Sequence, residues 1–352
     1  MKSASIVSIT YYLPEKKLGN RVLAELFSGW TEDKIARKLG IVERPIAAMN
    51  ETAVDMAVLA AERLFDKGVC EPEEIDYVLL CTQSPDYLLP TSACIVHERL
   101  GLPKACGALD FNLGCSGYVY GLSLAKGLVE GGMAQNLLLL TSETYTKYIN
   151  QLDRGSRPLF GDAAAATLIR GVDAVGQQGD VKIAEPSIGP FVFGTDGSGA
   201  DLLIVPAGGH RSPVKTDDYI ERSDGRGSVR SRVQLSMHGP GIFAFAIDRV
   251  PTAVRELLDK SGKTKDDIGC YVFHQANKYM LDKLRELCNI DEAKYYNDMA
   301  YRGNTVSSSI PIAMVDAFES GMLKTGESVM LVGFGVGLSW AAGLVVLPDC
   351  FC

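Results

Sequence analysis

The chain has 352 residues, of which 47% are hydrophobic and 22% charged, a balance that excludes a disordered or collagen-like protein. This length exceeds what one hydrophobic core usually fills and favours two domains or one large layered unit. The formal net charge of −8 argues against general nucleic-acid binding, so any acidic partner would have to meet a local basic patch.

Predicted strands and helices alternate through the first half of the chain. In order they are a strand at 4–10, a helix at 53–65, a strand at 75–81, a helix at 91–100, a helix that opens at Cys115, a strand at 136–141 and an alanine-rich segment at 160–169. Such alternation implies crossover connections and mostly parallel sheets that are covered by helices.

The second half repeats the order of the first. Leu64-Phe-Asp-Lys has a counterpart in Leu257-Leu-Asp-Lys, and the helix that opens at Cys115 has a counterpart that opens at Asn304. Two halves of similar design are therefore expected. If they pack about a pseudo-twofold axis, Cys115 of one half meets His274 and Asn304 of the other.

Three segments follow from this repeat. Residues 1–175 form an N-terminal half with a nucleophilic cysteine, 236–352 form a C-terminal half with a histidine and an asparagine, and 176–235 form a connecting excursion. Within that excursion the pattern is lost, and residues 208–235 hold six Lys or Arg against four Asp or Glu. The part of the excursion at 195–235 is an insertion. Its simplest interpretation is a solvated connection, and the alternative is a lid or a partner-docking loop.

Cys115 is the candidate nucleophile. It follows a short apolar segment and opens a run whose apolar residues recur at helical spacing. The free N–H groups and positive dipole end of a helix N-terminus stabilise a thiolate, so we expect the pKa of Cys115 to lie toward or below neutrality. Because most cysteines are simply small buried hydrophobic residues, this interpretation depends on the partners of Cys115.

Two polar residues are candidate partners of that cysteine. His274 ends a short apolar run and should project from a strand end, where α/β folds place ligands, although a structural hydrogen-bonding role is equally compatible with this position. Asn304 precedes small polar residues and an apolar helix, a pattern typical of a helix N-cap. The glycine-rich segment 333–340 lacks the lysine of a P-loop, so we interpret it as a turn that presents an N–H to an oxyanion.

The cysteines and the N-terminus indicate a reduced, cytoplasmic protein. Nine cysteines are scattered with neither metal-binding spacing nor a disulfide framework, so no metal site is expected. The apolar run within residues 1–14 is too short for a secretory signal. No apolar stretch reaches membrane-spanning length, so no membrane partner is expected either.

Five motifs together resemble those of β-ketoacyl-acyl carrier protein synthase III. They are Leu113-Gly-Cys-Ser-Gly, Phe160-Gly-Asp, His274-Gln-Ala-Asn, Arg302-Gly-Asn-Thr-Val-Ser-Ser-Ser-Ile-Pro and Gly333-Phe-Gly-Val-Gly-Leu-Ser-Trp. The resemblance implies a duplicated thiolase-like fold with five layers, α/β/α/β/α, a homodimer and a Cys-His-Asn site. It also implies acyl-chain condensation, as in fatty-acid biosynthesis, with acyl-coenzyme A or acyl-carrier-protein thioesters and malonyl-acyl carrier protein as substrates and partners.

The same resemblance assigns a role to each residue of the site. Cys115 would take the acyl group as a thioester, and its backbone N–H and that of Val336 would form the oxyanion hole. His274 and Asn304 would hold the thioester oxygen of a malonyl group as carbon dioxide leaves. For this the His274 ring must be neutral, which a nonpolar tunnel favours. No metal or redox cofactor is needed.

Substrate-binding residues follow from the resemblance as well. Family members that accept coenzyme A usually carry a tryptophan that stacks on adenine. Counting back from residues 39–44 places Lys34 at that position, and Trp30 lies one helical turn away. Arg154 matches the opposing arginine, Leu89 would reach into the partner subunit's tunnel, and Asn277 and Phe334 would contact the thioester. The plausible docking charges for an acidic carrier protein are Lys34, Arg37, Lys38, Lys278, Lys283 and Arg285.

Other functions remain open at this point. A papain-type cysteine hydrolase also carries Cys, His and Asn in this order, but its local cysteine signature is missing here. An acyltransferase of the same fold could pass the acyl group from Cys115 to an alcohol or amine, because it needs Cys115 and His274 without decarboxylation. A non-catalytic subunit is disfavoured because all three site residues are present.

Overall fold

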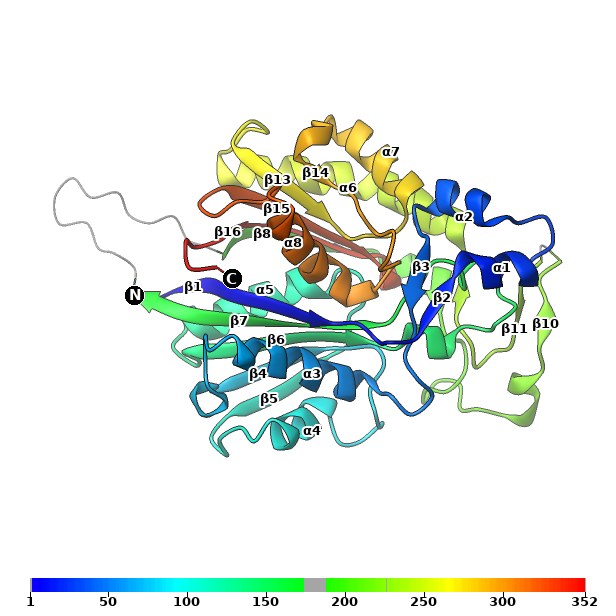
Figure 1. Cartoon of the computed structure of the whole chain (residues 1–352), viewed down its shortest axis with the longest axis horizontal. Helices are drawn as coiled ribbons and strands as arrows, with labels where there is room; N and C mark the ends of the chain where they lie inside the picture. Colours follow the sequence, from blue (N-terminus) through cyan, green and yellow to red (C-terminus); the bar gives the residue numbers. More distant parts are fainter. Residues whose placement is uncertain (1, 174–187, 226, 352) are drawn as a thin grey trace.

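The computed structural model describes residues 2–173, 188–225 and 227–351, which build two five-stranded sheets with helices between and outside them (Figure 1). The first sheet has the order β1-β7-β6-β4-β5. Its strands are β1 (Lys2–Tyr12), β4 (Tyr77–Cys81), β5 (Gly107–Phe111), β6 (Asn136–Glu143) and β7 (Ala163–Asp173). The second sheet has the order β14-β13-β15-β16-β8. Its strands are β8 (Ile188–Thr195), β13 (Ile268–Phe273), β14 (Tyr295–Tyr296), β15 (Ser328–Gly335) and β16 (Ser339–Val346).

The predicted duplication is confirmed by these orders. Read from its other edge, the second sheet is β8-β16-β15-β13-β14, which matches the first sheet strand for strand. The expectation of mostly parallel sheets is wrong. In the first sheet β4 pairs in parallel with β5 and β6, whereas β7 is antiparallel to both β6 and β1, and the second sheet repeats this mixture. In the second sheet β15 and β16 are antiparallel because the short turn Val336–Leu338, and not a helical crossover, connects them.

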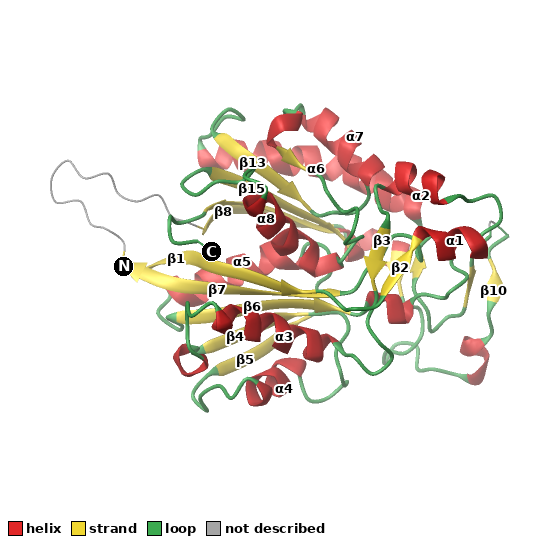
Figure 2. Ribbon diagram, viewed as in Figure 1, coloured by secondary structure: helices red, strands yellow, loops and turns green. Residues whose placement is uncertain are grey.

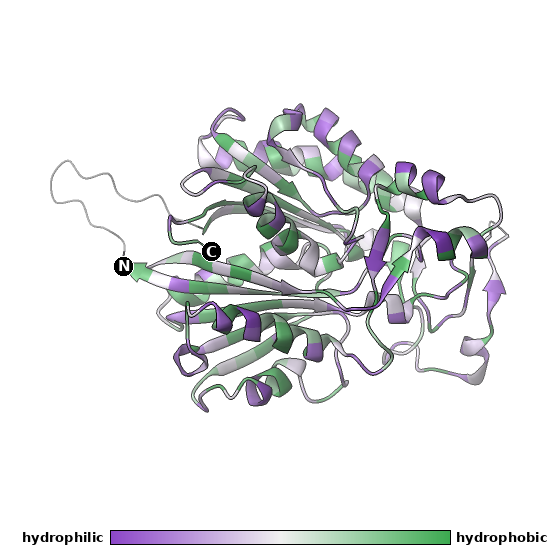
Figure 3. Cartoon of the chain, viewed as in Figure 1, coloured by the Kyte–Doolittle hydropathy of each residue, from purple (hydrophilic) through white to green (hydrophobic). Residues whose placement is uncertain are grey.

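Five layers result, as expected for α/β/α/β/α (Figure 2). Helices α5 (Gly117–Glu130) and α8 (Ser309–Glu319) lie between the sheets and contact both of them. The outer layers are α3 (Ala53–Asp66) with α4 (Ser92–Arg99) on the first sheet, and α6 (Gly239–Ser261) with α7 (Lys278–Cys288) on the second. Helix α8 is buried along nearly its whole length, whereas α7 buries one face, as the hydropathy pattern in Figure 3 illustrates.

Short elements gather at the end of the molecule where β15 ends (Figure 1). From the N-terminal half they are β2 (Lys17–Gly19), α1 (Asn20–Leu26), α2 (Glu32–Leu39) and β3 (Glu43–Pro45). From the excursion and the residues just after it they are β9 (Leu203–Ile204), β10 (Arg222–Ser223), β11 (Val229–Arg230) and β12 (Ser236–Met237). Of these elements, α2, β9, β11 and β12 contribute residues to the cavity described below.

The segment boundaries differ from those expected. Strand β8 belongs to the second sheet, so residues 188–195 are part of the C-terminal half and the boundary expected at 236 falls inside that unit. The boundary expected at 175–176 lies outside the described residues. Among the helices that the structure describes, none combines the length and apolar character needed to cross a membrane.

Candidate active site

Three separate elements bring the candidate residues to one place. Cys115 lies between β5 and α5, His274 follows β13, and Asn304 lies between β14 and α8. The backbone N–H of His274 continues the sheet by donating to the carbonyl of Val332 (2.8 Å). All three side chains line one cavity of about 1000 Å³, so the convergence expected from the repeat is present in the fold.

Glycines allow the chain to approach the Cys115 sulfur closely. A Cβ on Gly335, at the end of β15, would lie 2.7 Å from Sγ of Cys115. A Cβ on Gly114 would lie 2.6 Å from both the Gln83 side chain and the Val336 side chain. Because real Cβ contacts are not that short, only glycine lets the end of β15 lie against the cysteine.

The pKa of Cys115 departs from the expectation. The residue immediately precedes Ser116, the N-cap of α5, so its position at a helix N-terminus is as predicted. Burial nevertheless raises the pKa of the thiol to about 12, although hydrogen bonding by the backbone of Val336 and of Cys115 itself lowers it. Desolvation therefore outweighs the helix terminus, and the resting residue is a thiol. The same two amides are those expected to form the oxyanion hole.

His274 is a buried, neutral base. Burial lowers the pKa of its ring to about 3, so the ring is uncharged across the physiological range, as the resemblance required. Its Nδ1 lies 2.7 Å from the hydroxyl oxygen of Ser309, the first residue of α8. The Phe334 ring packs edge-to-face on it, with ring centroids 5.5 Å apart.

Asn304 is not the N-cap of α8, contrary to the simplest interpretation of its sequence context. That helix begins at Ser309, and a 3₁₀ turn, Val306–Ser308, comes first. The Asn304 Oδ1 accepts a hydrogen bond from the backbone N–H of Val306 (3.0 Å), and Nδ2 lies 3.5 Å from the carbonyl of Ala276. Val306 has a φ of 54°, a strained conformation for a β-branched residue.

Glu143 is a buried carboxyl group beside this site that sequence reasoning missed. It accepts hydrogen bonds from the backbone N–H of Gln83 and the hydroxyl of Ser84 in one half, and from the hydroxyl of Ser307 in the other. Burial raises its pKa to about 8 against the effect of these donors. An acidic residue at the end of an apolar strand was the available signal, but the predicted strand stopped at residue 141.

The mouth of the cavity contains the residues expected to meet the thioester donor. The guanidinium carbon of Arg154 lies 5.1 Å from the ring centroid of Trp30. The tryptophan that faces this arginine is therefore Trp30, which lies one helical turn from the position of Lys34 where it was expected. Lys34 also lines the cavity, and its Nζ donates to the carbonyl of Gly29 (3.0 Å).

The remaining predicted binding residues divide into two groups. Asn277 and Phe334 line the cavity, although the Asn277 side chain also caps α7 by accepting from the N–H of Met280 (3.0 Å). Leu89 is 87% exposed and does not belong to the cavity wall of its own chain.

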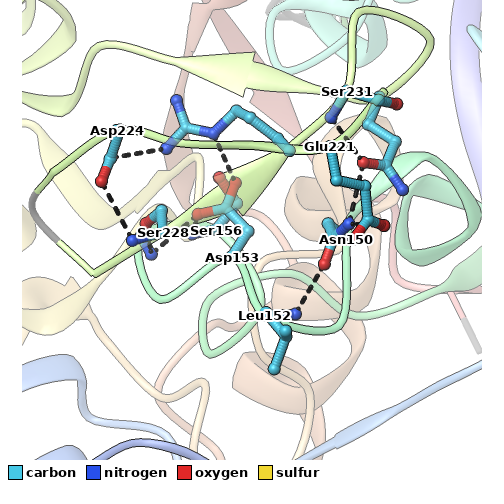
Figure 4. A network of polar contacts seen from close by, with 11 residues as sticks. Asn150, Leu152, Asp153, Ser156, Glu221, Asp224, Ser228 and Ser231 are labelled. Atoms are coloured by element: carbon cyan, nitrogen blue, oxygen red, sulfur yellow. Dashed lines mark hydrogen bonds and ion pairs between the residues drawn. The ribbon is translucent and has the colours of Figure 1, made fainter. Parts of the chain in front are cut away.

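The excursion is part of the cavity wall and not merely a solvated connection. Leu203, Asp224, Ser228 and Arg230 all line the cavity. An ion pair of Arg230 with Asp153 and a hydrogen bond from Gly155 to Ser228 fasten the excursion to the segment around Asp153 (Figure 4). Glycine and charge content correctly indicated loops here, but loop composition does not reveal what a loop packs against.

Comparisons with known proteins agree along the length of the chain. Residues 109–189 match the family described as 3-oxoacyl-[acyl-carrier-protein (ACP)] synthase III, and residues 258–347 match the family of its C-terminal part. A β-ketoacyl-[acyl-carrier-protein] synthase III from Caldanaerobacter subterraneus subsp. tengcongensis is 34% identical over 343 residues, 97% of each chain.

Solved structures are similar as well. A crystal structure of a 3-oxoacyl-(acyl-carrier-protein) synthase III superimposes with a TM-score of 0.93 and 50% identity, covering 98% of this chain and 100% of the other. A 3-oxoacyl-(acyl-carrier protein) synthase from Burkholderia xenovorans LB400 has a TM-score of 0.87 and 30% identity, covering 99% and 95%.

Proposed function

The chain belongs to the 3-oxoacyl-[acyl-carrier-protein] synthase III family of acyl-transferring, condensing enzymes of fatty-acid biosynthesis, and from this premise we propose that Cys115, His274 and Asn304 carry out the condensing reaction. The observation that supports these roles best is the meeting of the three side chains in one cavity, with the backbone amides of Cys115 and Val336 at the sulfur.

In the first half-reaction the sulfur of Cys115 attacks the carbonyl carbon of an acyl thioester. The carbonyl oxygen becomes an oxyanion that the N–H groups of Cys115 and Val336 stabilise, each donor contributing about 3 kcal/mol. The intermediate collapses, the bond to the donor sulfur breaks, and the donor leaves as a thiol with the proton that Cys115 loses. Because the resting residue is a thiol, this proton leaves the sulfur before the attack, and the minor thiolate fraction is the reacting species.

In the second half-reaction a malonyl thioester loses its carboxylate as carbon dioxide. The electron pair of the broken carbon–carbon bond forms an enolate whose oxygen accepts hydrogen bonds from the neutral His274 ring and the Asn304 amide. The enolate carbon attacks the acyl carbon on Cys115 and forms the new carbon–carbon bond. The Cys115 thiolate leaves and is reprotonated, and the product is a 3-oxoacyl thioester.

The partners belong to the same proposal. Malonyl-acyl carrier protein supplies the extender, and Lys34, Arg37, Lys38 and Lys278 at the cavity mouth complement an acidic carrier. A homodimer is supported by the exposed Leu89 and by the open edge of β5. A cytoplasmic location is supported by the free cysteines of the described residues.

A second candidate is transfer of the acyl group to an alcohol or amine. It would use Cys115 and His274 and leave Asn304 without a role. The position of the Asn304 amide on the same cavity as His274 favours the condensing reaction, because two donors suit one enolate oxygen.

Intact-mass spectrometry after incubation with a panel of acyl thioesters tests the proposal. We expect one acyl adduct that is absent from the Cys115→Ala variant, and malonyl-acyl carrier protein should discharge it as a 3-oxoacyl product. An adduct on the alanine variant would contradict the role of Cys115. An adduct that malonyl-carrier protein leaves untouched would favour transfer to an alcohol or amine.

A further inference from the structure

The two amides proposed for the oxyanion hole come from different halves of the fold. Cys115 precedes α5 in the N-terminal half, whereas Val336 opens the turn between β15 and β16 in the C-terminal half. Their separation is therefore set by contacts between the halves and not by the local chain. An oxyanion hole accelerates acyl transfer because its donors are already in place when the charge develops. The contacts that hold the turn against Cys115 consequently affect the reaction.

Two buried serines form one such contact. Ser116 directly follows Cys115, and its hydroxyl oxygen lies 2.7 Å from that of Ser339, the first residue of β16. The Ser339 hydroxyl donates to the carbonyl of Val336 (3.1 Å). Because that hydroxyl has a single hydrogen, it accepts from Ser116, and the bonds run from Ser116 to Ser339 to Val336. This chain of hydrogen bonds joins the residue beside one amide donor to the residue that carries the other.

Ser116 lies at a position where serine usually caps a helix. It is the N-cap of α5, and a serine there commonly accepts a hydrogen bond from the first turn of its helix. Within the described residues, the Ser116 side chain makes no such bond to α5 and pairs with β16 instead. The close approach of β15 to this point depends on Gly333, where an added Cβ would lie 2.7 Å from Cα of Ser116. The hydroxyl therefore serves the contact between the halves and not the start of the helix.

The turn that begins at Val336 has a strained backbone. Leu338, its last residue, has a φ of 49°, which leucine rarely adopts. A strained conformation persists only where surrounding contacts hold it. The carbonyl of Leu338 accepts from the N–H of Asp196 (3.0 Å), and an added Cβ on Gly199 would lie 2.1 Å from Cδ1 of Leu338. These contacts fix the end of the turn, whereas the two serines fix its start at Val336.

We propose that Ser116 and Ser339 are positioning residues that keep the N–H of Val336 at the Cys115 sulfur and so maintain a preformed oxyanion hole. The proposal rests on the function proposed above and adds two residues to it. Neither hydroxyl has to touch the substrate, because both act through the backbone of Val336. Loss of either hydroxyl slows the steps that form an oxyanion on the acyl group. It spares malonyl decarboxylation, for which the histidine and the asparagine of the site are proposed.

The test measures the two half-reactions of Ser339→Ala separately. Acylation of Cys115 is followed by rapid-quench intact mass over a range of acyl thioester concentrations, and malonyl decarboxylation is followed by release of carbon dioxide. We expect the maximal acylation rate to fall about tenfold at an unchanged half-saturating donor concentration, because the donor binds as before and only its oxyanion is less well stabilised. Decarboxylation should stay within about twofold of wild type. Unchanged acylation, or equal losses in both half-reactions, overturns the proposal. A wild-type protein that no thioester acylates would instead contradict the proposed function.

A double-mutant cycle tests whether Ser116 acts through Ser339. We expect Ser116→Ala to lower the maximal acylation rate about threefold, and the double variant to lose no more than Ser339→Ala alone, since the Ser116 hydroxyl then has no acceptor to act through. Losses that multiply in the double variant would contradict this chain of bonds. Ser123→Ala is the matched control, because it removes a hydroxyl of the same helix that donates to the carbonyl of Tyr120 (2.7 Å). It should leave both half-reactions unchanged.

Circular dichroism and urea unfolding separate the effect on the hole from an effect on the fold. A protein that is only less stable, but still folded at the assay temperature, would keep the wild-type ratio of acylation to decarboxylation. If Ser339→Ala does not fold, Ser116→Ala decides, because it leaves the bond from Ser339 to Val336 in place. A loss confined to its acylation supports the proposal, and unchanged acylation or equal losses in both half-reactions contradict it.

Discussion

Cys115 is held between opposing electrostatic effects. Burial disfavours a thiolate, while the backbone amides of Val336 and Cys115 favour negative charge near the sulfur. In the resting protein burial dominates and the sulfur keeps its proton. In the acylation proposed above, the negative charge moves to the substrate oxygen, which we propose the same amides stabilise.

The pH dependence of acylation follows from the raised pKa of Cys115. With a pKa of about 12, the thiolate fraction rises about tenfold per pH unit below that value. We therefore expect the acylation rate to increase from pH 6 to pH 9 without levelling off, when rapid-quench samples are analysed by intact mass. A plateau that begins below pH 8 would show that the thiol ionises near neutrality. Cys115→Ala supplies the background at each pH.

The Ser309 hydroxyl lies within hydrogen-bond distance of Nδ1 of His274 (2.7 Å). When its hydroxyl donates to Nδ1, the single proton of the neutral ring lies on Nε2, which can then donate to the enolate oxygen. We expect Ser309→Ala to lower the rate of malonyl decarboxylation about tenfold and to leave Cys115 acylation nearly unchanged.

Ser308→Ala is the matched control for that experiment. Ser308 is the adjacent residue, but its hydroxyl contacts Thr141 and not the histidine. Equal losses in the two half-reactions of Ser309→Ala, or equal losses in both variants, would mean that the ring is not oriented by Ser309.

At the scale of elements, helix α7 begins at the cavity and its cap residue is part of the wall. Asn277 lies at the N-cap and accepts from the N–H of Met280, while the helix itself carries Lys278 at the mouth. The residue expected only to bind the thioester therefore also determines where this helix starts.

Substitution of Asn277 measures how much its capping hydrogen bond contributes to the free energy of unfolding. We expect Asn277→Ala to lower the free energy of unfolding by about 1 kcal/mol, because the N–H of Met280 loses its acceptor. Asn277→Asp keeps an acceptor oxygen at the helix N-terminus and should retain most of the stability. Urea unfolding of the three proteins at pH 7 measures this. Equal stability of the alanine and wild-type proteins would show that the cap contributes nothing.

At the scale of the whole molecule, Glu143 couples the two halves of the fold. Its carboxylate accepts from Gln83 and Ser84 in the N-terminal half and from Ser307 in the C-terminal half. Burial raises its pKa to about 8 from the ordinary 4.5, so the folded state holds this proton more tightly than the unfolded state. The corresponding stability is present at low pH and is lost as pH rises through about 8.

Glu143→Gln should remove this pH dependence. The amide stays neutral, so we expect the stability of the variant relative to wild type to increase from pH 5 to pH 9 in urea unfolding. Ionisation of other groups cancels in the difference. A constant difference between the two proteins over this range would mean that Glu143 is already ionised at pH 5.

The free edge of the first sheet predicts self-association. Strand β5 ends the sheet and exposes Leu109 (45%), and Leu88 and Leu89 are more than four-fifths exposed. We expect a dimer by light scattering, and Leu109→Lys should weaken it at least about tenfold. Leu287→Lys, at an equally exposed leucine on α7, is the control. A monomeric wild-type protein would contradict the prediction.

Much of the architecture was predictable because it depends on local pattern. Periodic apolar residues predicted most of the helices and strands, and the repeat predicted the match between β1-β7-β6-β4-β5 and its counterpart. The repeat also predicted that Cys115, His274 and Asn304 would meet, because strand ends of duplicated halves face one another. The antiparallel strands were missed, since the periodicity of a strand does not specify the direction of its neighbours.

By itself the sequence determined the duplicated fold and the family, and it indicated the three residues proposed for the site, since each depends on residue identity and spacing along the chain. Only the tertiary structure decided the protonation of Cys115, because desolvation depends on every atom around the sulfur. It also decided that Trp30 contacts Arg154 and that the excursion approaches Arg154 at Gly227. These are contacts between loops of independent sequence, and no local pattern specifies which surface a loop covers.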